Sequence, residues 1–377
     1  MEFELNEEQK MFKESIKNFA EREVAPIVDE SENEESCPVG LFSKLGKLGY
    51  LCPGYPTEYG GGGLGEVGTC IMVEEIARIC SGIASGLMVQ SGLATFPIWA
   101  HGSEEQKRKF LTPAIKGEKI SAFGLTEPNA GSDAAAIETT AKREGNNYVI
   151  NGNKIYITNG TICDFVTLAA STDRSKGSRG ISTIILEKDT PGFSVAKMRK
   201  LGHHSAATGE LAFDNCRVPL DNLIGEEEKG FKYMLEALNP ARISHSARSL
   251  GLAQATFDAS LNYAKERVQF SQPIGKFQAI SFKLARMATA IEAARSLLYR
   301  VARLFDQGEE CRKEAPMTKL FSAEVAIRVV EEAMRIYAGA GYLAESPVQR
   351  YFRDAILYCT TEGTTEIQEL VIYRAFA

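Results

Sequence analysis

The spacing of apolar residues changes twice along this chain of 377 residues, and both changes limit the folds that it can adopt. Before residue 120 the spacing is that of amphipathic helices, as in the first segment with Phe12, Ile16 and Phe19. From Ser121 onward, short runs separated by turn residues are typical of a small β-barrel or sandwich. After Gly230 the helical spacing returns over several long segments, which indicates a helical bundle.

We therefore expect an α+β fold with an N-terminal helical domain (1–120), a β domain (121–229) and a C-terminal four-helix bundle (230–377). Asn151-Gly152 is a common hairpin turn, so we expect a hairpin there, with Tyr156 and Thr158 on one face of its second strand. The expected strands are 148–150, 154–158, 165–170, 181–186, 193–198 and 210–213. The expected bundle helices are 231–238, 244–264, 280–306, 315–337 and 347–356.

The composition argues against several functional classes. A net charge of −6 disfavours nucleic acid as a partner, because binding phosphates needs a clustered basic surface. The uncharged run 80–102 contains Gln90, Pro97 and many small polar residues, so we expect buried helices there and no membrane span. The acidic N-terminus does not resemble a signal peptide. Eight cysteines without a CxxC pair and four histidines without metal-ligand spacing indicate a reduced, cytoplasmic setting and no metal site.

Residues 123–133, FGLTEPNAGSD, contain the clearest candidate binding loop. Pro128 to Gly131 is a strong turn signal. The amides of Gly131 and Ser132, with the Ser132 hydroxyl, could converge on an anion such as a pyrophosphate. Thr126 lies before the turn, where its hydroxyl could reach a ring system lying against the strand. An ordinary polar loop would have a similar composition, so this motif alone leaves both interpretations open.

Residues 123–133, together with KIYITNG at 154–160, resemble two motifs of the acyl-CoA dehydrogenases, a family of flavoenzymes. The resemblance covers the whole chain, including the order of helical, β and bundle domains. In that family both motifs hold FAD, which implies cofactor contacts by Phe123, Leu125, Thr126, Gly131, Ser132, Tyr156 and Thr158.

Glu362-Gly363-Thr364 matches the family's catalytic segment. There the glutamate removes the α-proton of an acyl-CoA while the β-hydride passes to the flavin, and its backbone N–H helps to stabilise the enolate. A carboxylate that merely begins a helix would be the simpler interpretation of an isolated EGT tripeptide. Some relatives carry the base on the first bundle helix, but the matching residue here is Ala241. Arg242 matches a family position near the active site, although a capping or surface arginine is the alternative.

Further matches imply a cofactor site shared between subunits, and hence a homotetramer. Residues 267–270 resemble the segment with which a neighbouring subunit grips FAD, and residues 336–342 resemble the glycine-rich turn near the adenosine, which could also be a plain helix C-cap. Arg335 and Ala338 stand where the family usually has glutamine and glycine. The implied additional cofactor contacts are Arg267, Gln269, Phe270, Gln278, Arg335, Ile336, Gly339, Thr364 and Glu366.

The residues around the expected acyl pocket are small. Thr361 precedes the base where tyrosine is common, and the helix expected opposite carries Ala84, Ser85, Gly86, Ser91 and Ala94. A wide pocket would suit a short, branched or alicyclic acyl group such as cyclohexanecarboxyl, although small residues also serve close helix packing. Glutaryl-CoA relatives have an arginine for the distal carboxylate where Ala84 stands, which disfavours a dicarboxylic substrate. The expected substrate contacts are Ser132, Arg242, Thr361 and Gly363.

The leading hypothesis is an FAD-dependent acyl-CoA dehydrogenase that passes electrons to an electron-transferring flavoprotein. An enoyl-CoA reductase or an acyl-CoA oxidase would use the same base and flavin, so the sequence leaves the direction and the electron acceptor open. A non-catalytic helical assembly protein would be colourless or inert toward acyl-CoAs. The glutamate at position 362 argues against that alternative and against a flavin monooxygenase on this fold.

Overall fold

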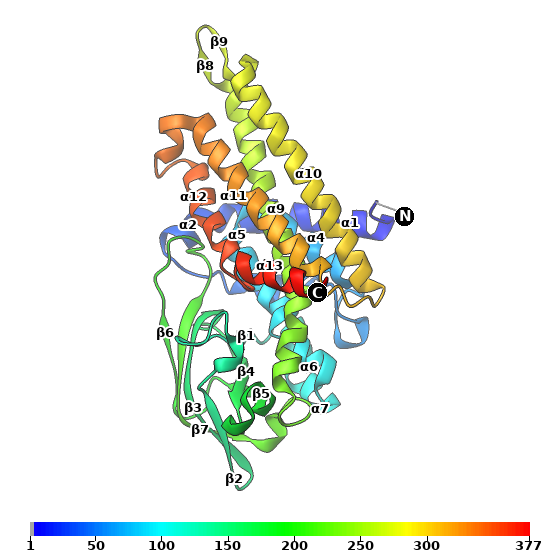
Figure 1. Ribbon diagram of the computed structural model, residues 1–377. Helices are drawn as coiled ribbons and strands as arrows, with labels where there is room; N and C mark the ends of the chain where they lie inside the picture. The colour runs from blue at the N-terminus through cyan, green and yellow to red at the C-terminus, as the bar shows by residue number, and fades with distance from the viewer. Residues whose placement is uncertain (1–3) are drawn as a thin grey trace.

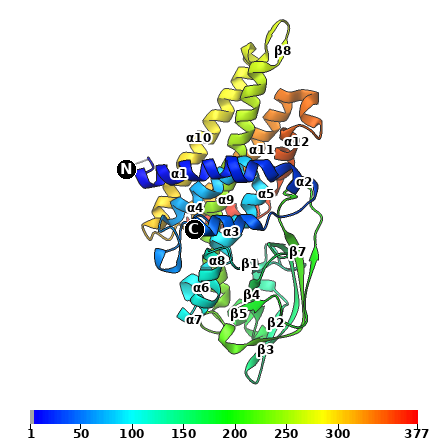
Figure 2. The ribbon, with the colours of Figure 1, turned by 180° about the vertical axis from the view of Figure 1, so that it is seen from behind.

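The computed structural model describes residues 4–377 and has an elongated shape with three regions (Figures 1 and 2). A β-sheet lies at one end, the tips of two long helices lie at the other, and the N-terminal helices pack between them. The predicted α+β class and the order of helical, β and helical segments are confirmed.

Helix α1 shows why the N-terminal segment folds as the sequence predicts. Its N-cap is Asn6, whose side chain accepts a hydrogen bond from the Gln9 amide at 2.8 Å, while the Gln9 side chain accepts from the Asn6 amide. The helix buries the three predicted apolar residues and then continues through a π-turn and a 3-10 turn that contains Pro26. The α-helices of this region are α1 Glu7–Phe19, α2 Val28–Asn33, α3 Gly40–Lys47, α4 Gly65–Ile79, α5 Ser81–Met88, α6 Phe96–His101, α7 Glu104–Gln106 and α8 Thr112–Ile115.

Seven strands form one mixed sheet in the order β1-β4-β2-β3-β7-β6, with β5 paired to β4. Strands β1 and β2 run parallel to β4, and the other pairs are antiparallel. The sequence analysis did not predict β1 or β2 as strands. The strands are β1 Ser121–Gly124, β2 Thr140–Glu144, β3 Asn147–Thr158, β4 Phe165–Ser171, β5 Ile181–Glu187, β6 Phe193–Lys197 and β7 Thr208–Pro219.

The predicted hairpin at Asn151-Gly152 was wrong, because both residues lie inside the continuous strand β3. The pairing of β3 with β7 shifts register between Ile150 and Gly152, so the pair forms a bulge. Gly152 has φ 143°, and a Cβ there would lie 2.7 Å from the Thr139 Cα, so glycine is required. A second register shift follows between Lys154 and Ile157, and the strict alternation expected for Tyr156 and Thr158 fails there.

Helix α9 (Gly230–Glu266) is the longest element and merges two predicted helices. Pro240 lies inside it without ending it. The helix packs against α4 and α11, and at Gly251 an added Cβ would lie 2.3 Å from the Glu74 carbonyl oxygen, so this glycine permits close approach to α4. The remaining elements are β8 Val268–Gln269, β9 Gln272–Pro273, α10 Gln278–Asp306, α11 Glu314–Tyr337, α12 Pro347–Ala355 and α13 Thr365–Arg374.

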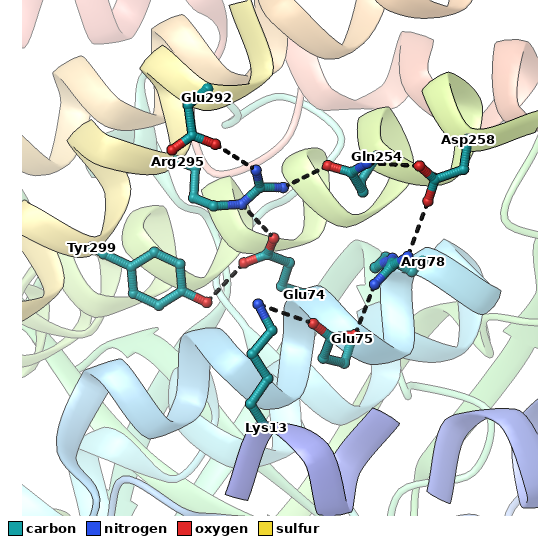
Figure 3. A network of polar contacts seen from close by, with 9 residues as sticks. All are labelled: Lys13, Glu74, Glu75, Arg78, Gln254, Asp258, Glu292, Arg295 and Tyr299. Carbon is teal, nitrogen blue, oxygen red and sulfur yellow. Dashed lines mark hydrogen bonds and ion pairs between the residues drawn. The ribbon is translucent and has the colours of Figure 1, made fainter. Parts of the chain in front are cut away.

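A network of polar side chains joins the N-terminal helices to the bundle (Figure 3). Glu74 of α4 is 1% exposed and accepts hydrogen bonds from Arg295 Nε at 3.0 Å and the Tyr299 hydroxyl at 2.7 Å, both on α10. Arg295 also donates to Gln254 on α9 at 2.9 Å. The network continues through Asp258, Arg78, Glu75 and Lys13. Separating the members of a buried ion pair would leave an uncompensated charge, which is unfavourable. These contacts therefore fix helices α1, α4, α9 and α10 relative to one another.

The segment Ser81–His101 is the one candidate membrane span among residues 4–377 by length and composition, with a mean hydropathy of 1.2. Of its most apolar window, 78% is buried inside the structure, which is typical of a core helix and makes this weak evidence for a membrane span.

Candidate active site

Glu362 lies in the loop before α13, and it does not begin the helix. Thr364 is the N-cap of α13, and its hydroxyl accepts a hydrogen bond from the Ile367 amide at 3.3 Å. Glu362 has φ 55° and Gly363 has φ 88°, so two successive residues adopt the left-handed conformation. A non-glycine residue is seldom held in that region unless its surroundings fix it, which makes Glu362 a candidate functional residue.

Two buried side chains hold this loop in place. Lys319 of α11 donates from Nζ to the Gly363 carbonyl oxygen at 2.7 Å. Gln368 of α13 donates to the carbonyl oxygens of Glu362 at 2.9 Å and Gly363 at 3.0 Å. The loop carbonyls are therefore satisfied, whereas the Glu362 amide donates no hydrogen bond within the described chain. The sequence analysis missed both Lys319 and Gln368, because their partners are carbonyl groups that no motif reveals.

The Glu362 carboxylate lies among cations but is not paired with any of them. Burial raises the pKa of this carboxyl, and Arg248, Arg242 and Lys319 act in the opposite direction. Between residues 4 and 377 no ion pair or hydrogen bond to the carboxylate is found, and the side chain remains partly exposed. A reachable carboxylate with a raised pKa is a suitable general base near neutral pH.

Arg242 of α9 faces the same site. Its side chain is 8% exposed, and it donates to the Asn239 side chain at 3.1 Å while its Nε has no acceptor. This arginine is therefore neither a surface residue nor a helix cap. Ala241, which matches the alternative base position, is 2% exposed and has no group that could take a proton.

Arg242 also lines a cavity of about 940 Å³, which Glu362 itself does not line. Helix α9 forms one wall, the loop around Arg179 forms another, and Val371 of α13 contributes to a third. Six cations and three carboxylates line the cavity, which favours an anionic ligand. They are Lys176, Arg179, Lys229, Lys232, Arg242, Arg312, Glu227, Glu228 and Glu236.

Thr361, the residue before the base, contacts a histidine that the sequence analysis did not single out. The Thr361 hydroxyl lies 2.9 Å from Nε2 of His245, which is fully buried in α9. Burial and the neighbouring Arg248 hold the pKa of His245 well below its usual value, so the ring is neutral. The small residues predicted opposite are buried in α5 and the turn after it. At Gly86 a Cβ would lie 2.8 Å from the Asn159 side chain, so helix packing explains this residue at least.

The two predicted cofactor motifs lie side by side in the sheet. The Ile155 amide donates to the Thr126 carbonyl oxygen at 3.0 Å, and Glu127 and Ala130 exchange backbone hydrogen bonds across the predicted turn. Beneath the turn, Lys154 donates to the buried Glu127 carboxylate at 2.7 Å and to the Leu125 carbonyl oxygen at 2.8 Å. This ion pair joins the first motif to the second.

The surface of these motifs fits the cofactor that the sequence implies. Gly131 and Ser132 are exposed, and within the described part of the chain their amides and the Ser132 hydroxyl have no hydrogen-bond partner. Free N–H and hydroxyl donors at a turn suit a pyrophosphate. Among the other predicted contacts, Tyr156 is exposed and Leu125 is buried. Three contacts are partly buried, namely Phe123, Thr126 and Thr158.

The second group of predicted cofactor residues lies far from Ser132 in the same chain. The exposed Arg267, Gln269 and Phe270 form the β8–β9 hairpin, at the opposite end of α9 from the sheet (Figure 1). A helix of 37 residues spans about 55 Å, so one chain does not bring the two groups together. Gln278 is also exposed, at the start of α10.

The predicted glycine-rich turn follows α11. Arg335 and Gly339 are exposed, whereas Ile336 is 3% exposed and its side chain belongs to the core. Ala338, which replaces the usual glycine, has φ 50° and ψ −133°, a backbone conformation that favours glycine. Glu366, the last predicted cofactor contact, is exposed in the first turn of α13.

Three family models match consecutive parts of the chain. They describe the N-terminal domain of acyl-CoA dehydrogenases at residues 6–118, the middle domain at 122–216 and the C-terminal domain at 228–377. Among curated proteins, the chain is 42% identical to "Acyl-CoA dehydrogenase, short-chain specific" of Clostridium acetobutylicum, over 99% of this chain and 98% of the relative.

Solved structures show the same similarity. Butyryl-CoA dehydrogenase from Megasphaera elsdenii matches with a TM-score of 0.97 and 41% identity, over 100% of both chains. A chain of the structure described as "Electron transferring flavoprotein of Acidaminococcus fermentans: Towards a mechanism of flavin-based electron bifurcation" matches with a TM-score of 0.98 and 42% identity, over 100% of this chain and 99% of the other.

Proposed function

The chain belongs to the acyl-CoA dehydrogenase family, whose members are FAD-dependent flavoenzymes, and from this premise we propose that Glu362 is the base that dehydrogenates a short acyl-CoA. The observation that carries the proposal is the loop around this residue. It holds a reachable, unpaired carboxylate with a raised pKa beside a free backbone N–H.

The two groups of Glu362 have complementary roles in the proposed reaction. The carboxylate removes the α-proton of the thioester, and the free amide donates a hydrogen bond to the carbonyl oxygen as negative charge develops there. When bound, FAD would be the oxidant and would accept the β-hydrogen together with two electrons from the substrate. Lys319 and Gln368 keep the amide and the carboxylate in position through the loop carbonyls.

FAD and the CoA portion of the substrate bind to different regions of the protein. Thr126, Ser132 and Thr158 contact FAD on the sheet, with Ser132 reaching the substrate as well. The cavity beside Arg242 receives the anionic CoA portion, because its lining has an excess of cations. We treat the segments 1–120, 121–229 and 230–377 as the three domains that supply these parts.

An oligomer would complete the cofactor site. Arg267 and its neighbours on the β8–β9 hairpin are exposed and remote from Ser132, so they reach the FAD of another subunit in a homotetramer. Large apolar side chains at this end support burial in an assembly, since Phe270 is 89% and Tyr342 is 83% exposed. An electron-transferring flavoprotein in the cytoplasm would take the electrons, as the description of one matched structure suggests.

Several relatives are named as short-chain specific enzymes, and residues of this chain would add width to the acyl pocket. Thr361 occupies less space than the tyrosine common in the family, so a short branched or alicyclic acyl group, such as cyclohexanecarboxyl, would fit beside the base. The small buried residues Ala84, Ser91 and Ala94 are compatible with such a group.

The test is a screen of acyl-CoA thioesters against the purified protein under anaerobic conditions. The protein should be yellow and should release FAD on denaturation. Butyryl-, isobutyryl- or cyclohexanecarboxyl-CoA should bleach the flavin absorbance, whereas palmitoyl-CoA should not. A protein that stays colourless after reconstitution with FAD, or a yellow protein that none of these thioesters bleaches, would contradict the proposal.

A further inference from the structure

We propose that the acyl pocket ends in an anion-binding site built around Arg248, and that the preferred substrate carries a carboxylate at the far end of a short acyl chain. The inference rests on the proposed function and names the substrate class for the same site. It replaces the expectation that a dicarboxylic substrate is disfavoured, and it makes the short, branched and alicyclic thioesters named above poorer substrates than a dicarboxylic one.

The guanidinium of Arg248 is buried without an acidic partner. The side chain is 2% exposed, and one nitrogen donates to the Ser85 hydroxyl at 2.6 Å. Its Nε has no acceptor, and in residues 4–377 no carboxylate oxygen lies within 4.0 Å of the group. The Tyr358 ring, 5.1 Å from the guanidinium carbon, provides a cation–π contact.

Some cations inside the described part of the fold have an acidic partner, whereas Arg248, like Arg242 and Lys319 beside the base, has none. Arg295 contacts Glu74, and Lys154 contacts Glu127, both at hydrogen-bond distance. A buried charge without a partner is strongly unfavourable, and an arginine presents a fork of donors that fits a carboxylate. An anion supplied by a ligand would therefore complete this site.

The groups around Arg248 are suited to a carboxylate. The Ser81 hydroxyl lies 2.5 Å from the Tyr358 hydroxyl and 3.2 Å from the His203 ring. His203 and His245 are both buried, and burial lowers the pKa of each well below its usual value, so neither adds charge. The acidic groups that face Arg248 are Asp354, which accepts from the His203 amide at 2.6 Å, and the base Glu362.

The position of Arg248 sets the length of the acyl chain. Arg248 lies about one turn of α9 after His245, whose ring contacts Thr361 next to the base, and the Tyr358 ring contacts both side chains, so Arg248 lies close to the base. The substrate carbons between them must be few, which favours a short dicarboxylic thioester such as glutaryl-CoA. The lack of an arginine at position 84 on α5 was an argument against such substrates. In this chain Arg248 of α9 would supply the cation instead, since it contacts Ser85, the neighbour of Ala84.

The experiment compares glutaryl-CoA with butyryl-CoA in wild type, Arg248→Gln and Arg248→Lys. The wild type should have the higher kcat/KM for glutaryl-CoA in anaerobic flavin reduction. Arg248→Gln should lower the glutaryl-to-butyryl ratio by about 10²-fold or more, since the substrate carboxylate would lose its partner. Arg248→Lys should restore part of the preference for glutaryl-CoA that Arg248→Gln loses, because lysine keeps the positive charge but lacks the paired donors of the guanidinium group. Arg217→Gln, an exposed arginine of β7 paired with Glu144, is the matched control.

Arg248 has an alternative role as a partner of the base. In that case Arg248→Gln would slow both thioesters equally and shift the pH profile without changing their ratio, which would overturn the proposal. A wild type that reduces its flavin with butyryl-CoA but shows no preference for glutaryl-CoA would overturn it as well, while leaving the proposed function intact. If no thioester bleaches the flavin, the proposed function fails. Calorimetric binding of both thioesters to Glu362→Gln, with and without Arg248→Gln, then still tests the anion site.

Discussion

Replacing Glu362 by glutamine separates the chemistry of the site from its structure. The carboxylate accepts no hydrogen bond within the described chain, and the loop is held by its carbonyl groups, so an amide of nearly the same shape should disturb neither. Because burial raises the pKa of the glutamate, removing the charge should leave the Tm unchanged or raise it. A variant that is folded and yellow yet inactive is therefore expected.

The size of the loss follows from what surrounds the carboxylate. Removing a general base commonly slows a reaction by about 10²–10⁴-fold, or about 2.7–5.4 kcal/mol in the activation barrier. The upper end is expected here, because Ala241 offers no second base and Arg242 and Arg248 stay protonated. Burial lowers the pKa of Lys319 to about 8, but its Nζ donates to a backbone carbonyl oxygen and does not replace the base.

The assay is anaerobic stopped-flow bleaching of the flavin by a substrate thioester, with Glu369→Gln as the control. Glu369 is an exposed glutamate of α13 outside the site. The wild-type rate should rise with pH through the pKa of Glu362, which lies above its usual value, because only the deprotonated form takes a proton. Bleaching by Glu362→Gln within tenfold of wild type, with the same pH dependence, would refute the assignment of the base.

Arg267→Ala should lower flavin occupancy, because a donor to the FAD of another subunit is lost; a fully flavinated monomer in native mass spectrometry would contradict the shared site. Thr361→Tyr should overpack the pocket by about 1–3 kcal/mol and displace the contact to His245. The kcat/KM ratio of cyclohexanecarboxyl-CoA to butyryl-CoA should then fall by about 5- to 150-fold, and an unchanged ratio would mean that Thr361 does not limit pocket width. Asp354→Asn should flatten the pH dependence of Tm. Burial raises the pKa of Asp354 to about 7, so the folded state binds this proton more tightly than the unfolded state does. The resulting stabilisation is present at low pH and is lost as the pH rises through about 7. Asparagine can still accept from the His203 amide, so a variant whose Tm declines from pH 5 to 8 as steeply as wild type would contradict this expectation.

Local signals predicted the features that depend on neighbours in the sequence. Asn6 with Gln9 and Ser103 with Gln106 form capping boxes that start helices, and each box depends only on residues three positions apart in the sequence. The start of the sheet at Ser121 and of α9 at Gly230 also matched the changes in apolar spacing.

Distant contacts explain what the sequence did not predict. The pair Asn151-Gly152 is compatible with a β-bulge and with a hairpin turn, and only the pairing of β3 with β7 determines which of the two forms. Pro240 does not end α9, because buried residues on both sides, including Ala237 and Ala241, keep the helix packed. Arg248 reaches a serine that is 163 residues away in the sequence, and no local pattern identifies such a contact.

The unbroken length of α9 restricts how this protein can diverge. One helix carries a wall of the cavity, Arg242, the pocket residues His245 and Arg248, and the β8–β9 hairpin. An insertion of one residue would turn everything after it by about 100° and advance it by about 1.5 Å, so all later contacts would lose their partners together. The exposed turn at Gly145 can change length without this penalty. New substrate preferences must therefore arise by substitution of side chains at fixed positions of α9. Insertions within this helix would disrupt the fold and would not be retained.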